Sequence, residues 1–177
     1  ELSQLDYIDG KMVEVSRVRI PPPKDPNSYC EKNWMPVIDE DYTYIKWCNP
    51  TEVVKVDPIE AKSTTSHLGS YYPAPNDFRG GTQVIPLVDG QRFALVHEVD
   101  LFRSEHDRKD AVYRHRFVIW DKDWNIVKFT NDFSMMNGHV EFAVGMCHHD
   151  NGQVLITFGF QDNAAYILQT TLQDIID

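Results

Sequence analysis

The stretch EFAVGMCHHDNGQVLITFGFQDNAAYILQTT, residues 141–171, decides the fold class of this chain. It consists of three apolar runs and two segments of turn-forming residues, in the order 142–147, HDNG at 149–152, 154–160, QDN at 161–163 and 165–171. Runs of β-branched and aromatic residues between turns of this kind predict antiparallel strands. We therefore expect three successive strands, followed by a single helical turn at 172–176.

Upstream of this stretch, the same alternation of apolar and polar residues predicts further strands. They are expected at 12–20, 33–38, 42–48, 53–56, 83–88, 92–99, 112–120 and 126–130. The segment PPPKDPNS at 21–28 excludes a helix or an inner strand, because proline lacks the backbone donor. Asp89-Gly90 predicts a hairpin turn. Residues 59–78 and 104–110 are expected to form loops, and the first of these is unusually long.

The expected strands fall into three groups that begin near Asn33, Gly81 and Glu141, 48 and 60 residues apart. Groups of about four strands at a period of roughly 40–50 residues are typical of propeller blades. Three groups and a leading strand pair amount to three blades and a fraction, whereas a propeller closes with about four blades or more. We therefore expect an all-β fold in which residues 1–177 form a single C-terminal portion of a propeller. This portion would be incomplete on its N-terminal side or closed by another chain.

The balance of charge limits the partners of the chain. Its 177 residues include 27 acidic and 17 basic side chains, which gives a net charge of −10. A general nucleic-acid binder and a protein of anionic membrane surfaces both need a basic surplus, so both classes are disfavoured. No apolar run approaches the ~20 residues of a membrane-spanning helix. The sequence does not otherwise indicate a location.

The three cysteines, Cys30, Cys48 and Cys147, are odd in number and widely spaced. This pattern matches neither a disulfide framework nor a zinc module. They are expected to be buried, reduced thiols.

Six motifs, in their order along the chain, resemble one known family. They are EKNWMP (31–36), RGGTQ (79–83), ALVHE (94–98), YRHRF (113–117), EFAVGM (141–146) and FGFQDNAA (158–165). The chain looks like the five-bladed propellers related to glycoside hydrolase family 130, which contains β-mannoside phosphorylases and hydrolases. A branch of that family with an EKNW-type motif is often associated with glycosyltransferases. The resemblance covers nearly the whole chain and implies a five-bladed propeller that acts on carbohydrates.

The resemblance also implies roles for single residues. Asp162 matches the family's sugar-contacting carboxylate, and Arg79 lies in a segment similar to the glycine-rich turn over the family's site. His97 and Glu98 fall where strand ends approach the central funnel. No residue of this chain matches the family's general acid, so binding without catalysis stays open beside catalysis.

Two carboxylates, Asp162 and Glu141, are the candidates for catalysis. In inverting cleavage of a glycosidic bond, a pair of carboxylates flanks the bond with room for water or phosphate. A carboxylate at the mouth of an apolar funnel can have a raised pKa and donate a proton. The alternative role for Asp162 is the capping of a turn.

The candidates for substrate binding are polar residues near strand ends or in the long loop, with one histidine in the middle of a strand. They are Glu31, Lys32, Asn33, Arg79, Thr82, His97, Glu98, Tyr72 and, in the middle of its strand, His115. Lysine and arginine would hold phosphate or sugar hydroxyls, and a loop tyrosine offers a flat face to a sugar ring. Structural alternatives stand beside these roles. Glu31 and Lys32 could form a surface charge pair, the RGGT segment a tight turn or β-bulge that needs positive φ, and His115 a packed histidine.

A metal site is not expected from the spacing of the candidate ligands. Strand alternation puts His97 on one face and Glu98 and Asp100 on the other, so one strand cannot present all three to an ion. No P-loop, dinucleotide-binding motif or nucleophile elbow occurs, and no cofactor is expected.

The function expected from these residues is that of a carbohydrate-active propeller. It would bind a glycan, with phosphate as a second candidate ligand, and cleave, phosphorolyse or transfer a glycosidic bond. The alternative is a non-catalytic glycan-recognition or assembly module attached to a glycosyltransferase or a larger complex. A third hypothesis is a structural β-domain of a larger particle.

Overall fold

Strands account for most of the chain. The computed structural model describes residues 1–24, 32–74, 77–106 and 109–176. Its strands are β1 (Leu2–Ile8), β2 (Lys11–Val18), β3 (Met35–Pro36), β4 (Thr43–Trp47), β5 (Glu52–Asp57), β6 (Lys62–Leu68), β7 (Arg79–Gly80), β8 (Ile85–Pro86), β9 (Arg92–Arg103), β10 (Lys109–Trp120), β11 (Ile126–Phe129), β12 (Glu141–His148), β13 (Gln153–Phe160) and β14 (Ala164–Thr171). A short α1 (Leu172–Ile176) follows β14. The prediction of an all-β fold is confirmed.

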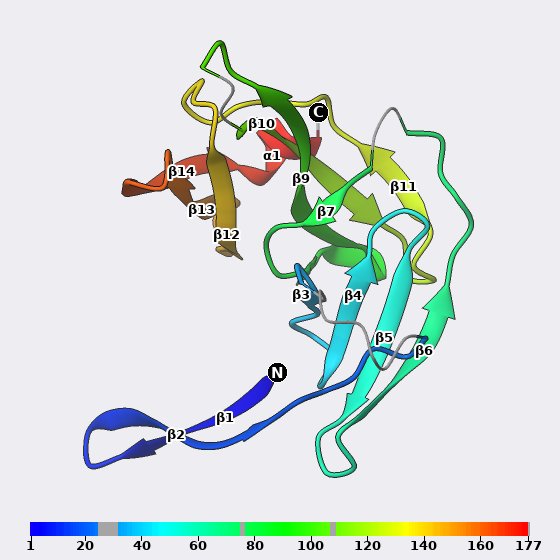
Figure 1. The fold of residues 1–177 in the computed structure, drawn as a ribbon. Coiled ribbons are helices and arrows are strands. Elements are labelled where there is room, and N and C mark those ends of the chain that lie inside the picture. Colours follow the sequence, from blue (N-terminus) through cyan, green and yellow to red (C-terminus); the bar gives the residue numbers. More distant parts are fainter. Residues whose placement is uncertain (25–31, 75–76, 107–108, 177) are drawn as a thin grey trace.

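The strands form a ribbon and three open antiparallel sheets (Figure 1). The N-terminal ribbon is the pair β1–β2, and the first sheet has the order β3-β4-β5-β6. The central sheet has the order β11-β10-β9-β7, with β8 also paired to β9, and the last sheet has the order β12-β13-β14. The three sheets begin at Met35, Arg79 and Glu141, close to the starts expected from the sequence. The propeller type and the number of its blades both stay predictions.

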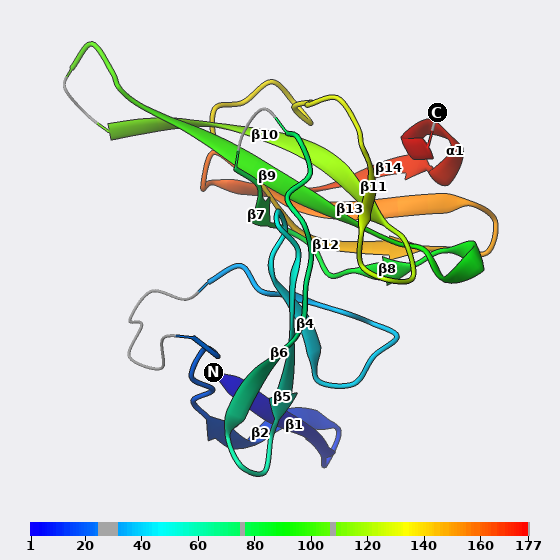
Figure 2. The same cartoon turned by 90° about the vertical axis from the view of Figure 1, so that its right-hand side faces the viewer.

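The central sheet is buried on both faces. Phe93 and Leu95 of β9 belong to a cluster shared with the last sheet, whereas their neighbours Ala94 and Val96 belong to a cluster shared with the first sheet. Successive side chains of a strand point to opposite faces, so β9 supplies both cores. Figure 2 shows the first sheet below β9 and β10, and Figure 1 shows the last sheet to their left.

The segment before β8 ties the central sheet to both of its neighbours. Val84 forms a parallel bridge with Val37, and its backbone amide donates to the carbonyl of Pro36 at 2.8 Å. The side chain of Gln83 accepts a bond from the backbone amide of Met146 in β12 at 3.2 Å and donates to the carbonyl of the same residue. Two adjacent residues therefore hold three sheets in register.

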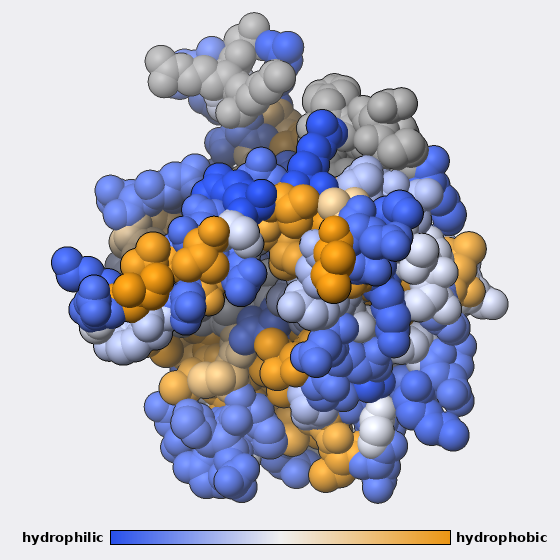
Figure 3. All heavy atoms as spheres, turned by 90° about the horizontal axis from the view of Figure 1, so that it is seen from below, coloured by the Kyte–Doolittle hydropathy of each residue, from blue (hydrophilic) through white to orange (hydrophobic). Residues whose placement is uncertain are grey.

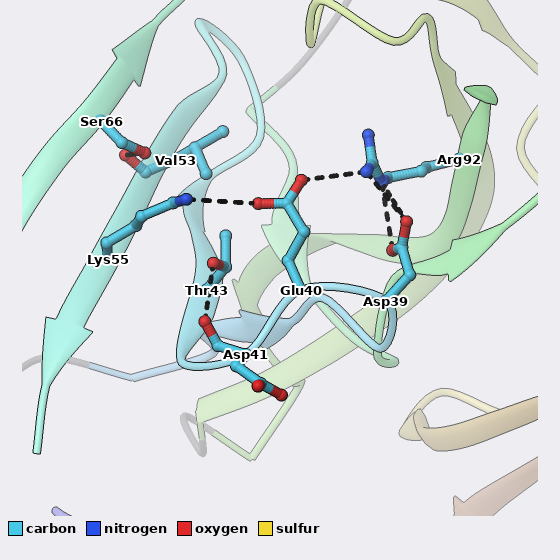
Figure 4. Close-up of polar contacts among 8 residues, drawn as sticks. All are labelled: Asp39, Glu40, Asp41, Thr43, Val53, Lys55, Ser66 and Arg92. Carbon is cyan, nitrogen blue, oxygen red and sulfur yellow. Dashed lines mark hydrogen bonds and ion pairs between the residues drawn. The ribbon is translucent and has the colours of Figure 1, made fainter.

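A charged turn adds a second link between the first and central sheets (Figure 4). The guanidinium of Arg92 donates to both carboxylate oxygens of Asp39 at 2.9–3.1 Å and to Glu40 at 2.9 Å. Glu40 also lies 3.7 Å from the ammonium of Lys55 in β5. The Arg92 guanidinium stacks 4.4 Å above the ring of Trp124.

Several element boundaries differ from the expectations. The segment 59–78 is not a continuous loop, because β6 occupies Lys62–Leu68. The expected leading strand pair is β1–β2, although only the range 12–20 was predicted for it. The strand predicted at 33–38 is reduced to β3. Strand β9 continues to Arg103, and β10 begins at Lys109, inside the segment 104–110 that was expected to be a loop. The turn at Asp89-Gly90 is confirmed, since both residues have positive φ, 57° and 75°.

The cysteines lie in different surroundings. Cys48 is a buried free thiol, as predicted, and burial raises its pKa. Cys147 is also free but exposed, so the expected burial was wrong there. Cys30 lies outside the described residues. In the described part of the chain, no helix has the length and apolar character needed to cross a membrane.

Candidate functional site

The pairing of β7, β9 and β10 brings three of the predicted site residues into one row. Arg79 lies opposite His97, and His97 lies opposite His115. The two histidines continue the face that carries Leu95 and Phe117, so their side chains look toward the last sheet. His97 is 3% exposed and His115 is fully buried.

Burial keeps this histidine pair neutral at pH 7. The pKa of His97 falls to about 4, because of burial and then of nearby positive charge: His115 when it is protonated, Arg79 and Lys32. Burial likewise lowers the pKa of His115 to about 4, and the charge of Glu141 opposes that shift. The structure therefore brings Lys32, Arg79, His97, His115 and Glu141 into one electrostatic neighbourhood.

The imidazole of His115 is unusual among the described side chains. Neither ring nitrogen has a hydrogen-bond partner within the described residues. Its ring lies 6.0 Å from that of Phe133, and the ring of His97 lies 4.9 Å from Phe142 and 5.6 Å from Tyr113. The pair thus sits among aromatic rings, where an unpaired polar group costs free energy unless a ligand or water satisfies it.

The two glycines of the RGGT segment are required because there is no room for a side chain at either position. A Cβ on Gly80 would collide with the carbonyl of Asn33, and one on Gly81 would lie 2.5 Å from the carbonyl oxygen of Leu95. Neither glycine has positive φ, so that part of the structural alternative was wrong. Thr82 is 1% exposed and pairs with both backbone groups of Leu95, at 3.0 and 3.1 Å. The segment therefore serves close packing around β9.

A cavity of about 300 Å³ lies beside this segment, between the first and central sheets. It is lined by Lys32, Asn33, Met35, Lys46, Trp47, Cys48, Phe78, Arg79 and Gly80. We call it the cationic cavity, because three of these side chains carry a positive charge. Lys46 lies 3.6 Å from Glu52, whereas Lys32 and Arg79 have no carboxylate partner among the described residues. A neighbouring cavity of about 290 Å³ shares Lys32 and Asn33.

Lys46, a member of the cationic cavity, was not expected from the sequence. Lys46 and Trp47 lie at the end of a strand that alternates strongly, and such residues are typical of sheet structure alone. Trp47 is 39% exposed, so its ring offers a face to a ligand.

Three predicted site residues lie apart from the histidine pair. Glu98 is on the opposite face of β9, as strand alternation predicted, and pairs with Arg116 at 3.4 Å. The ring of Tyr72 packs edge-on against Phe129 at 5.1 Å. Asp162 is exposed in the turn between β13 and β14, with φ 51°.

The last two predicted positions have different outcomes. Glu141 is fully buried at the start of β12, and its carboxylate accepts bonds from three backbone amides. Glu31 lies outside the described residues. Within the described ranges, no group of three or more histidine, cysteine, aspartate or glutamate side chains is arranged to hold a metal ion.

No protein-family model and no curated protein matches this chain. Among solved structures, the chain is similar to a mannose phosphorylase from Leishmania mexicana in complex with a phosphate ion, with a TM-score of 0.52 and 14% identity over 93% of this chain and 56% of that one. It is also similar to a GDP-Man-dependent mannosyltransferase from Leishmania mexicana, with a TM-score of 0.51 and 13% identity over 80% of this chain and 51% of that one.

A glycosyl hydrolase from Bacteroides ovatus matches with a TM-score of 0.47 and 11% identity over 97% of this chain and 48% of that one. The chain spans about half the length of the solved structures that it matches. At these identities the likeness concerns the fold. The chain shares its fold with a phosphorylase and a transferase that act on carbohydrates.

Proposed function

We propose that this chain is part of a carbohydrate-active propeller and that its cationic cavity binds a sugar together with a phosphate group. The observation that carries the proposal is the cavity itself, where Lys32, Lys46 and Arg79 meet in a chain of net charge −10. Against that background, three cations around one cavity form a local positive field. Such a field favours a small anion.

The other lining residues suit a sugar. The exposed ring of Trp47 can stack on the apolar face of a pyranose, and the amide of Asn33 can bond its hydroxyls. The guanidinium of Arg79 presents the planar fork that binds phosphate oxygens. A mannosyl phosphate has a pyranose face, hydroxyls and a phosphate group, and so offers a partner to each of these side chains.

The similar folds favour the same substrate class. One is a mannose phosphorylase solved with a phosphate ion and the other a GDP-Man-dependent mannosyltransferase. We propose that the three sheets are successive blades of the five-bladed type and that the ligand is a mannoside or mannose 1-phosphate. Cleavage, phosphorolysis or transfer would then use Asp162 as a carboxylate.

A second candidate function is glycan recognition without turnover. Neither Asp162 nor Glu141 lines the cationic cavity. The carboxylate of Glu141 is already bonded to three backbone amides. These contacts favour a chain that holds the ligand while another part of a complex does the chemistry.

The binding proposal is tested by calorimetric titration of the full chain with mannose 1-phosphate. Arg79→Gln should weaken binding about tenfold or more, because it removes a charge-assisted contact to phosphate. Lys62→Ala, which removes an exposed lysine far from the cavity in β6, should leave binding unchanged. Equal affinity of wild type and Arg79→Gln would contradict the proposal.

Turnover is tested separately by incubating the chain with β-mannosides, with and without inorganic phosphate. Release of mannose or mannose 1-phosphate that is lost in Asp162→Asn would support the enzyme. Binding without release would leave the recognition module as the function.

A further inference from the structure

We propose that Glu141 is a positioning residue that holds residues 133–139, here called the strap, between the histidine pair and the turn that carries Asp162. The proposal deepens the proposed function, on which only its consequence for ligand binding rests. It gives Glu141 a role other than that of a general acid.

Both carboxylate oxygens of Glu141 accept hydrogen bonds from the strap. Oε2 accepts a bond from the backbone amide of Met135 at 2.6 Å. Oε1 accepts bonds from the amides of Met136 and Gly138 at 3.0 and 2.6 Å. The side chain is fully buried, so these three donors replace its hydration. A group engaged in this way fixes a backbone and is not free to face a substrate.

The strap in turn completes the edge of β10. The backbone of Phe133 exchanges two hydrogen bonds of 2.9 Å with His115, and the amide of Tyr113 donates to the carbonyl of His139 at 2.9 Å. Strand β11 pairs with β10 only at Val118–Trp120, so the strap takes over where β11 has ended. In Figure 1 the strap lies in the yellow stretch between β11 and β12. His115 is therefore held by β9 on one side and by the strap on the other.

The opposite side of the strap packs on the turn between β13 and β14. A Cβ on Gly138 would collide with the ring of Phe160 and lie 2.8 Å from the side-chain nitrogen of Gln161. The amide of Gln161 donates to the carbonyl of Val140 at 2.7 Å. Because Asp162 follows directly, the strap joins the buried histidine to the exposed aspartate. Glu141 fixes the geometry of that connection.

The first test is amide hydrogen exchange of the full chain by NMR. Glu141→Gln replaces an acceptor oxygen by a donor and should speed exchange of the Met135, Met136 and Gly138 amides by about tenfold or more. Asp121→Asn is the matched control, since it neutralises another carboxylate that accepts backbone amides, those of Asp123 and Asn125, and should leave the strap amides protected. Strap amides that stay protected in Glu141→Gln would overturn the proposal.

The second test measures phosphate binding at the proposed site. Inorganic phosphate is titrated while the imidazole resonances of His97 and His115 are followed. Positioning predicts binding weakened about fivefold or more in Glu141→Gln and unchanged in Asp121→Asn. Unchanged binding alongside a loosened strap would reduce Glu141 to a structural residue and overturn its positioning role. If the wild-type chain binds no phosphate, the proposed function fails, and the strap is then judged by exchange alone.

A third variant applies if Glu141→Gln does not fold. Gly138→Ala pushes the strap away from Phe160 without changing any charge. It should loosen the same amides and weaken phosphate binding in the same direction. Normal protection and affinity in Gly138→Ala would count against the strap.

Discussion

At the scale of single residues, the histidine pair makes folding depend on pH. His97 and His115 have pKa values of about 4 in the folded chain, against 6.5 for an ordinary histidine. Between these values the unfolded chain binds more protons than the folded one, so the stability falls as pH falls from 6.5 towards 4. Above pH 6.5 the contribution is fully present. A shift of this size corresponds to roughly 3 kcal/mol for each histidine.

Urea denaturation at several pH values between 7.5 and 4.5 measures this dependence. His115→Phe should flatten it, because one of the two buried bases is gone. His149→Gln, at an exposed turn position, should leave the slope as it is in wild type. The same slope in His115→Phe and wild type would show that the buried imidazole is not the source.

A second prediction concerns one buried hydrogen bond. The indole nitrogen of Trp120 donates to the hydroxyl of Thr51 at 3.0 Å, and both residues are almost fully buried. Thr51→Val keeps the shape but leaves the indole N–H without an acceptor, at a cost of about 1–3 kcal/mol. Thr51→Ser keeps the hydroxyl and should be closer to wild type. Chemical denaturation at pH 7 compares the three, and a valine variant as stable as wild type would refute the estimate.

At the scale of elements, the link between the first and central sheets depends on a planar cation. Arg92 contacts both Asp39 and Glu40 through its fork, and its side chain is only 12% exposed. A lysine at this position cannot reach both partners in the same geometry. Arg92→Lys should therefore lower the free energy of unfolding by about 1–2 kcal/mol.

The control for this variant is Arg17→Lys in the N-terminal ribbon. Arg17 also bonds a carboxylate, Glu14, but its side chain is 57% exposed. Exposed pairs of this kind contribute about 0–1 kcal/mol, so little change is expected. Equal losses in both variants would mean that burial does not distinguish the two pairs.

The strands that could be predicted from the sequence are those that bury a face in the core. Strands β9, β10, β12 and β13 bury at least one face, so their apolar residues show the pattern in the sequence. Strand β6, KSTTSHL, lies at the edge of the first sheet and buries neither face fully, so it resembled a loop. The same reasoning explains why no range was predicted for β1, whose side chains are exposed along nearly its whole length.

The candidate site was predictable where it depends on local geometry. Alternation alone separated His97 from Glu98. The meeting of Lys46 with Arg79 depends on how two sheets pack, and no spacing along the chain encodes it. The hydrogen bonds that engage the Glu141 carboxylate depend on the path of the strap, which the spacing of residues does not encode either.

At the scale of the whole molecule, the two hydrophobic clusters show which parts of the chain the fold needs. Both clusters include residues of the central sheet, one with the first sheet and one with the last sheet. The N-terminal ribbon contributes no residue to either cluster. Its apolar side chains Leu5, Tyr7 and Met12 are 56%, 68% and 61% exposed. Figure 3, seen from below, shows hydrophobic side chains among hydrophilic ones on this side of the molecule.

A chain shortened to residues 20–177 should therefore keep its fold. Its melting temperature should stay within about 3 °C of that of residues 1–177, because the ribbon's main packing is between its own two strands. Circular dichroism measures the transition, and amide exchange in β9 reports whether both cores survive.

The control removes residues 164–177 instead, where Leu168, Leu172 and Ile175 pack on the cluster shared with the last sheet. That truncation exposes a core and should abolish the cooperative transition. A loss of about 10 °C on removing the ribbon would show that it packs on the sheets, and its exposed side chains would then belong to the core of the chain.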